Sequence, residues 1–302
     1  MRPLSFFIKQ PQGFSIPEIA VSLLVCSFVS LSALHIFRAD QKIFVEQEEV
    51  VDMQQNARIA MDQLIKDIRV AGMGVPSGGV ASDVGHLFPV IPGNGGGNIP
   101  DTITLLASFE NIETQLSAPM PNESAELKVT DASEFEVGAL GIIYGAVDEG
   151  GQAGELFQIT HISTHGQHML QHRKSPPWNK DQKLSYTFIP PSTIYMMSHR
   201  KYFVDSSDND HPKLIMSENE GDPLILADNI ENLQLTYDLL TGEMDLSDPQ
   251  FPVLIRKVTV SLVARTNTPD PQWNNGIHSI TGAGDNYRRL ILKSDVFVRN
   301  TK

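Results

Sequence analysis

The chain has 302 residues, a single cysteine and a formal net charge of −13. Its one cysteine, Cys26, excludes a disulfide within the chain and a metal site built from several thiolates. The acidic balance argues against a general nucleic-acid-binding protein, because such proteins neutralise phosphates with a basic surface. We therefore expect no nucleic-acid partner.

An apolar stretch lies near the start of the chain. Ile19–Phe37 contains no Asp, Glu, Lys or Arg, and it comes close to the length that spans a bilayer. Glu18 stands at its beginning, where a carboxylate is unfavourable unless it has a partner, so we interpret Glu18 as functional. Arg2 and Lys9 precede the stretch, which favours a cytoplasmic N-terminus.

A helical pattern continues beyond the apolar stretch. No Gly or Pro lies between Glu18 and Ala71, and Gly72 is a suitable C-terminal cap. Apolar residues recur at steps of three, four or seven, at Ile43, Val50, Ala57, Met61, Leu64, Ile65 and Ile68. The sequence therefore predicts one helix over 14–71. About 16–37 would span a membrane, and the second half would place one face on a globular domain.

The remaining residues, 72–302, predict a β-rich globular domain. Gly72–Pro100 is rich in Gly and Pro and is expected to be a long connection; it lacks the Lys-Ser/Thr ending of a phosphate-binding loop. The main strand candidates are Thr102–Leu106, Thr193–Met197, Tyr202–Val204, Ile230–Leu239, Val258–Ala264 and Leu290–Val298. No helix-length crossover separates them, so we expect antiparallel sheet. The predicted class is α+β, a long N-terminal helix packed on a C-terminal antiparallel β-rich domain.

The stretch Gly13-Phe14-Ser15-Ile16-Pro17-Glu18 resembles the processing site of type IV prepilins. In that family a dedicated peptidase cuts after the glycine and methylates the new phenylalanine amine. A glutamate five residues into the mature chain is the family's hallmark. Pro17 stands where an aliphatic residue is commoner, and the first turn of a helix tolerates it. The resemblance implies a leader over 1–13, cleavage between Gly13 and Phe14, and N-methylation of Phe14.

Further segments are similar to PilW-type minor pilins, namely Asn56-Ala57-Arg58, Asp67–Gly72, Asp101–Thr104, Leu226–Tyr237 and Tyr287-Arg288-Arg289. The resemblance implies a minor pilin that takes part in pilus assembly and initiation, in the tip complex. Before assembly the chain would lie in the inner membrane, with its globular domain (the head, 72–302) in the periplasm. It would then enter the pilus. Its partners would be other pilins and minor pilins through the N-terminal helix, the prepilin peptidase/methylase, the inner membrane and the pilus assembly platform.

The resemblance also gives Glu18 a role in assembly. N-methylation keeps the amine of Phe14 cationic, and parallel helices in a fibre would place this cation near Glu18 of an adjacent chain. Such a pair is much stronger in a low-dielectric bundle than at a surface, provided that both charges are paired. We expect Glu18→Ala to leave processing largely intact and to impair incorporation into the filament.

Two groups of potential metal ligands occur in the second half of the chain: His161, His165, His168 and His172, and Asp205, Asp208 and Asp210. A turn near Gly166 predicts a hairpin that scatters the histidines over two faces. The aspartates are of the type that calcium prefers, but they lack the full loop signature, so an exposed turn is favoured. We expect no metal and no cofactor, with these aspartates as the remaining candidates.

Other classes of function stay open. The chain contains no nucleophile elbow, no His-Glu-x-x-His motif and no dinucleotide fingerprint, so we expect that it is not an enzyme. Pseudopilins of the J type, from type II secretion systems, share much of the pattern and are the first alternative. A membrane-anchored adhesin and a periplasmic enzyme are the others.

Overall fold

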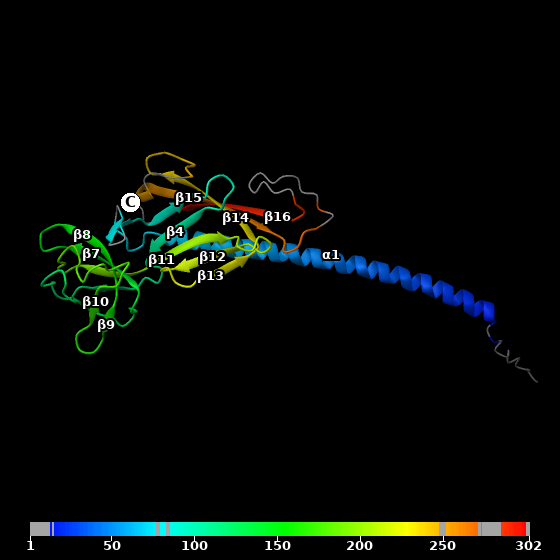
Figure 1. The fold of residues 1–302 in the computed structure, drawn as a ribbon, viewed down its shortest axis with the longest axis horizontal. Coiled ribbons are helices and arrows are strands. Elements are labelled where there is room, and N and C mark those ends of the chain that lie inside the picture. The colour runs from blue at the N-terminus through cyan, green and yellow to red at the C-terminus, as the bar shows by residue number, and fades with distance from the viewer. Residues whose placement is uncertain are drawn as a thin grey trace, which may run out of the picture. The chain divides into compact units, whose positions relative to one another are not determined.

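The computed structural model describes residues 13, 15–76, 79–82, 85–247, 252–270, 273 and 285–299. These residues form one long helix and a set of mainly antiparallel strands (Figure 1). The chain divides into two compact units, Met1–Val50 and Val51–Lys302. The final twenty residues of the helix therefore belong to the same unit as the strands.

The helix α1 runs over Ile16–Val70, close to the predicted range of 14–71. It begins after Ser15, and it ends where Gly72 adopts a positive φ of 83°, a conformation that glycine reaches without a steric cost. The Gly72 N–H donates to the carbonyl of Leu106 at 2.9 Å, so the cap also joins the helix end to a strand.

The described part of the first unit is Gly13, Ser15 and the part of α1 before Val51. Every residue from Ile16 to Val45 is exposed. The hydroxyls of Ser27 and Ser32 donate to the carbonyls four residues earlier, at 2.7 and 2.9 Å, so these polar groups are satisfied inside the helix. In length and composition, α1 could cross a membrane.

The last part of α1 is amphipathic and belongs to the second unit. Its buried residues are Met53, Ala57, Ala60, Met61, Leu64, Asp67 and Ile68, which follow the three-and-four spacing of one helix face. Four of them were predicted from the apolar pattern. Ile43, which the same pattern included, lies in the first unit and is 51% exposed.

The described strands of the second unit form three sheets. Their bounds are β1 (Val80–Ser82), β2 (Gly85–Leu87), β3 (Val90–Gly93), β4 (Thr102–Ala107), β5 (Glu113–Gln115), β6 (Leu127–Lys128), β7 (Leu140–Ala146), β8 (Gln152–Gln158), β9 (His161–Ser163), β10 (Met169–Gln171), β11 (Thr193–Asp205), β12 (Lys213–Glu218), β13 (Leu224–Asp228), β14 (Ile230–Leu239), β15 (Ile255–Arg265) and β16 (Arg289–Phe297). A short helix, η1 (Pro252–Leu254), precedes β15.

The largest sheet has the order β13-β12-β11-β7-β8-β1-β2, with β4 and β5 also paired to β11 and β3 paired to β4. The other sheets are β6-β10-β9 and β14-β15-β16. The described pairs are antiparallel except β1 with β8, so the predicted α+β class with an antiparallel β domain is confirmed at this level. Strands β7 to β10 gather at one end of the unit, and β14 and β16 lie at the other (Figure 1).

Two local predictions were wrong. Gly72–Pro100, expected to be a connection, contains the short strands β1, β2 and β3. The two strands predicted within 193–204 are the single strand β11, because the polar residues between them also pair: Ser198 to Tyr202 lie opposite Ala107 to Ile103 of β4. The polar run does not interrupt the strand, since its backbone is bonded and one of its side chains, Arg200, donates to the buried Asp67.

The two faces of β11 point to different surroundings. Tyr202 and its neighbour across the ladder, Ile103 of β4, are fully buried on the face that meets α1. Successive side chains of a strand point to opposite faces, so Lys201 and Phe203 lie on the other face. That face forms a groove, which is described below.

Candidate functional site

The first candidate site is the start of α1. Ser15 caps the helix, and the side chain of Glu18 turns back to it. The Ser15 N–H donates to Oε2 of Glu18 at 2.9 Å, and the Ser15 hydroxyl donates to the same oxygen at 2.8 Å. The bond from the Ser15 N–H is one half of a capping box of the Ser-x-x-Glu type, and it satisfies a backbone donor that a helix start leaves free. The positive end of the helix dipole also favours a carboxylate in this position.

The capping box leaves part of the Glu18 carboxylate available. Both hydrogen bonds end on Oε2, and among the described residues Oε1 accepts none. A second donor from outside the chain can therefore bind Oε1 without breaking the cap. The sequence prediction identified Glu18 but missed Ser15, although the spacing of a serine three residues before a glutamate is a known helix-start signal.

Gly13 lies just before this turn and is exposed. A Cβ added at Gly13 would meet no heavy atom within 4 Å in the part of the chain that the structure describes, and its φ is not positive. Neither crowding nor backbone conformation therefore requires glycine at this position. Phe14, the residue predicted to become the mature N-terminus, and the leader residues 1–12 lie outside the described residues.

The apolar side chains that follow Glu18 remain exposed along the first unit. The large ones are Ile19, Val21, Leu23, Leu24, Val25, Phe28, Val29, Leu31, Leu34, Ile36 and Phe37, each about half exposed or more. They surround the helix on all sides, so they do not form the single stripe of a helix that packs on its own domain. A surface of this kind is favourable only in lipid or against other apolar helices.

A buried polar cluster joins the last part of α1 to β11 within the second unit. Asp67, which is only 1% exposed, accepts hydrogen bonds from the Tyr202 hydroxyl and from Nη1 of Arg200, the latter at 3.1 Å. Arg200 also donates from Nε to Glu218 at 3.2 Å, and its guanidinium lies 4.0 Å from the ring centroid of Phe109. Burial, followed by the bond to Asp67, raises the pKa of the Tyr202 hydroxyl, so Tyr202 is a neutral donor. The cluster fixes the helix on the sheet.

The aspartates and histidines that were weighed as potential metal ligands have other partners. Asp205 and Asp208 each accept a backbone N–H two residues ahead, at 2.9 and 3.0 Å, as turn-forming aspartates do. Of the histidines, His168 accepts the Ala132 N–H through Nδ1, while His172 is buried and contacts the carbonyl of Ala125 through Nε2. Within the described ranges, no three His, Cys, Asp or Glu side chains gather in a way that could hold a metal ion.

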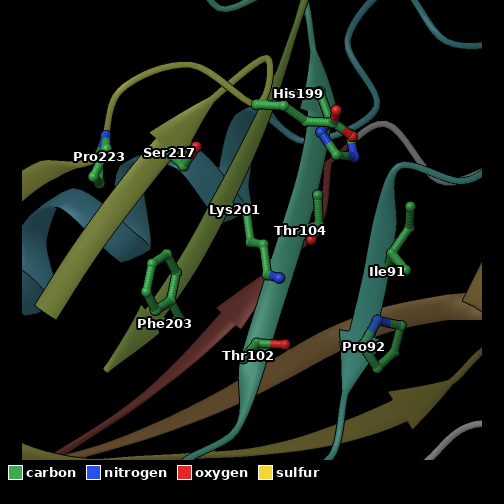
Figure 2. Close-up of a pocket in the computed structure, with 10 residues that line it drawn as sticks. Ile91, Pro92, Thr102, Thr104, His199, Lys201, Phe203, Ser217 and Pro223 are labelled. Carbon is green, nitrogen blue, oxygen red and sulfur yellow. The ribbon is translucent and has the colours of Figure 1, made fainter. Parts of the chain in front are cut away.

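A second candidate site is the groove on the face of β11 that points away from α1. It is a cavity of about 690 Å³, open to solvent, and its lining comes from β3, β4, β11, β12 and the turn between β12 and β13 (Figure 2). The lining residues are Ile91, Pro92, Thr102, Thr104, His199, Lys201, Phe203, Ser217, Glu220 and Pro223. Sequence analysis missed this groove, because its residues come from four separate segments and only the strand pairing brings them together.

His199 closes one end of the groove. Its ring makes an edge contact with Trp178 at 5.8 Å between centroids, and burial lowers its pKa. Its backbone and Asn219 exchange hydrogen bonds of 2.8 Å, which hold the turn after β12 against β11. The turn carries Glu220, whose charge acts on His199. These bonds hold the turn after β12, which forms one side of the groove, against β11.

Comparison of the chain with protein-family models, with curated proteins and with solved structures gives no match.

Proposed function

We propose that this chain is a minor type IV pilin of the PilW kind, which is cut after Gly13, N-methylated at Phe14 and taken into a pilus through the first part of α1. The observation that carries the proposal is the arrangement at the helix start. A glycine that the fold does not need is followed by a capped carboxylate, and then by an apolar helix surface exposed on all sides.

The glycine supports the processing step. A peptidase that cuts within an extended segment needs the backbone to enter its cleft, and a residue without a Cβ allows this approach. Gly13 is exposed, and a Cβ added there would meet no described heavy atom within 4 Å, so a glycine at this position fits recognition by an external partner. The prepilin peptidase/methylase is that partner in this proposal.

The exposed apolar surface supports a membrane stage and an assembly stage. Before assembly, α1 spans the inner membrane with its N-terminus in the cytoplasm and the head in the periplasm. In the pilus, contacts with the helices of other pilins replace the lipid contacts, with little change in the apolar environment. The assembly platform drives this exchange, and the head takes its place in the tip complex. The proposal assigns no catalytic step to the head.

The oxygen Oε1 of Glu18, which accepts no hydrogen bond from the described residues, supports a contact between subunits. Its Oε2 is already used by Ser15, and Oε1 is open to the cationic N-terminus of a neighbouring chain. A charge pair of this kind is favourable in an apolar bundle only when both members are present and hydrogen-bonded, so it selects one register of the two helices.

The test is to replace Glu18 by Gln and to measure the subunit in sheared filaments and in the inner membrane. Gln keeps the size of the side chain and can still accept the Ser15 bonds, so the cap survives while the charge is lost. We expect at least a tenfold loss from filaments, with normal processing. Glu48→Gln, at an exposed position further along α1, is the matched control and should be recovered normally. Normal recovery of Glu18→Gln in filaments would refute the assembly role of Glu18.

A further inference from the structure

The two faces of β11 carry neighbouring cations in opposite situations. Arg200, on the face toward α1, is bonded to two carboxylates, those of Asp67 and Glu218. Lys201, on the groove face, has no ion pair and no side-chain hydrogen bond in the described part of the chain. Its Nζ lies 5.8 Å from the ring centroid of Phe203. In a chain with a net charge of −13, an ammonium left without a carboxylate is an open binding group.

The strand register places hydroxyl groups on both sides of this ammonium. Lys201 lies opposite Thr104 of β4 and opposite Ser217 of β12, and Thr104 lies opposite Ile91 of β3. These pairs form one row across β3, β4, β11 and β12, on the groove face of the sheet, and its members are Ile91, Thr104, Lys201 and Ser217. The positions beside a strand lysine are where a carboxylate would give a favourable cross-strand pair, and here both hold hydroxyls instead. The Ser217 hydroxyl donates to the carbonyl of Gly221 at 3.1 Å. The ammonium of Lys201 and the hydroxyl of Thr104 are therefore the two donors that fit the oxygens of a carboxylate from outside.

Apolar side chains lie on both sides of the charged row. Figure 2 shows Lys201 in the centre of the groove, with Ile91 and Pro92 of β3 on one side and Phe203 on the other. Pro223 contributes to the wall beyond β12. A small free acid would fill the charged centre and leave these apolar groups in contact with water. A chain segment with an acidic side chain between apolar ones would cover both.

We propose that this groove binds an extended segment of a partner protein in which a Glu or Asp side chain, flanked by apolar residues, reaches Lys201. The carboxylate accepts hydrogen bonds from the Lys201 ammonium and from the hydroxyl of Thr104. The flanking side chains contact Ile91 and Pro92 on one side and Phe203 on the other. The site lies wholly within the second unit, and it holds whether or not the chain enters a pilus.

The experiment uses the full chain in detergent micelles and a fluorescein-labelled peptide, acetyl-Gly-Ser-Val-Glu-Val-Ser-Gly-amide, followed by anisotropy at low salt. A second peptide carries Gln in place of Glu, and any partition into micelles is common to both. We expect saturable binding of the Glu peptide and about tenfold weaker binding of the Gln peptide, since a bond to a charged group contributes about that factor. Lys201→Met should weaken binding of the Glu peptide by a similar factor.

Lys128→Met, at an exposed lysine of β6, is the matched control and should bind the Glu peptide normally. Equal binding of the Glu and Gln peptides by the unaltered chain, or no saturable binding, would overturn the proposal without reference to any variant. Normal binding by Lys201→Met would place the carboxylate elsewhere and overturn it too. Glucuronate is a free sugar acid. If glucuronate displaced the labelled peptide as effectively as the unlabelled Glu peptide does, the groove would be a sugar-acid site instead.

Discussion

The two parts of α1 share one continuous helix but have different surroundings. Before Val51 the side chains are exposed almost throughout, including the large apolar ones. After Val51 one face is buried to near completion, and Leu64 and Ile68 have no exposed surface. The first part has an exposed carboxylate at its start, Glu18, bonded only to Ser15 among the described residues, and the second has a buried carboxylate, Asp67, that accepts hydrogen bonds from Arg200 and Tyr202.

This difference separates two kinds of sequence constraint. In the second part the apolar residues pack on the strands of the same chain, so they lie on one face of the helix. In the first part apolar residues occupy all faces, which serves no contact within the described chain. Under the proposed function, these residues are required by surroundings outside the chain, which are lipid before assembly and other pilin helices after it. Changes in the two parts should therefore affect different measurements.

The largest effect is expected from Asp67→Ala in the second part. The change leaves Arg200 and the hydroxyl of Tyr202 without their buried partner, which should lower the free energy of unfolding by about 4 kcal/mol. Urea titration of the solubilised chain, followed by tryptophan fluorescence, measures this. Asp40→Ala, at an exposed position in the first part, should change the same quantity by less than about 0.5 kcal/mol. Equal effects of the two variants would contradict the contrast between the two parts.

A leucine-to-alanine substitution in each part of α1 tests the difference between buried and exposed surroundings. Leu64 is fully buried, so Leu64→Ala removes core contacts and should cost about 3 kcal/mol of unfolding free energy. Leu31 is 64% exposed, and Leu31→Ala should leave unfolding of the strand-containing unit unchanged within about 0.5 kcal/mol. The account would fail here if Leu31→Ala destabilised that unit as much as Leu64→Ala does.

The smallest effect concerns pH and should also be confined to the second unit. Burial holds the pKa of His172 below its ordinary value of 6.5. Below pH 6.5 the unfolded chain therefore binds a proton that the folded chain resists, and stability falls as the pH falls toward the lowered pKa. The slope for one such group is at most about 1.4 kcal/mol per pH unit.

His199, whose pKa burial also lowers, should add to this slope in the same direction. His172→Gln should reduce the slope between pH 6.5 and 5, whereas His165→Gln, at an exposed turn, should leave it unchanged. Urea titrations at several pH values measure it. An identical slope in His172→Gln and in the unaltered chain would show that His172 is not the group responsible.

The sequence was informative where structure depends on neighbours along the chain. The absence of Gly and Pro from Glu18 to Ala71 predicted the helix, and the apolar spacing predicted that Ala57, Met61, Leu64 and Ile68 share a buried face. The start signal formed by Ser15 and Glu18 was equally local and could have been found.

The sequence was uninformative where structure depends on distant residues. Asp67 and Arg200 are 133 positions apart, so neither reveals the other as its partner. Polar residues in the middle of β11 suggested a break, because the bonds that stabilise them come from β4 and α1. The groove around Lys201 depends on the register of four strands, and no local pattern encodes that register.

The most direct test of the account is the mass of the N-terminal peptide of the chain, isolated from cells that contain the complete pilus machinery. The account predicts a peptide that begins at Phe14 and carries one added methyl group on its amine. A chain that retains residues before Gly13, in cells where it is assembled and functional, would contradict the central claim.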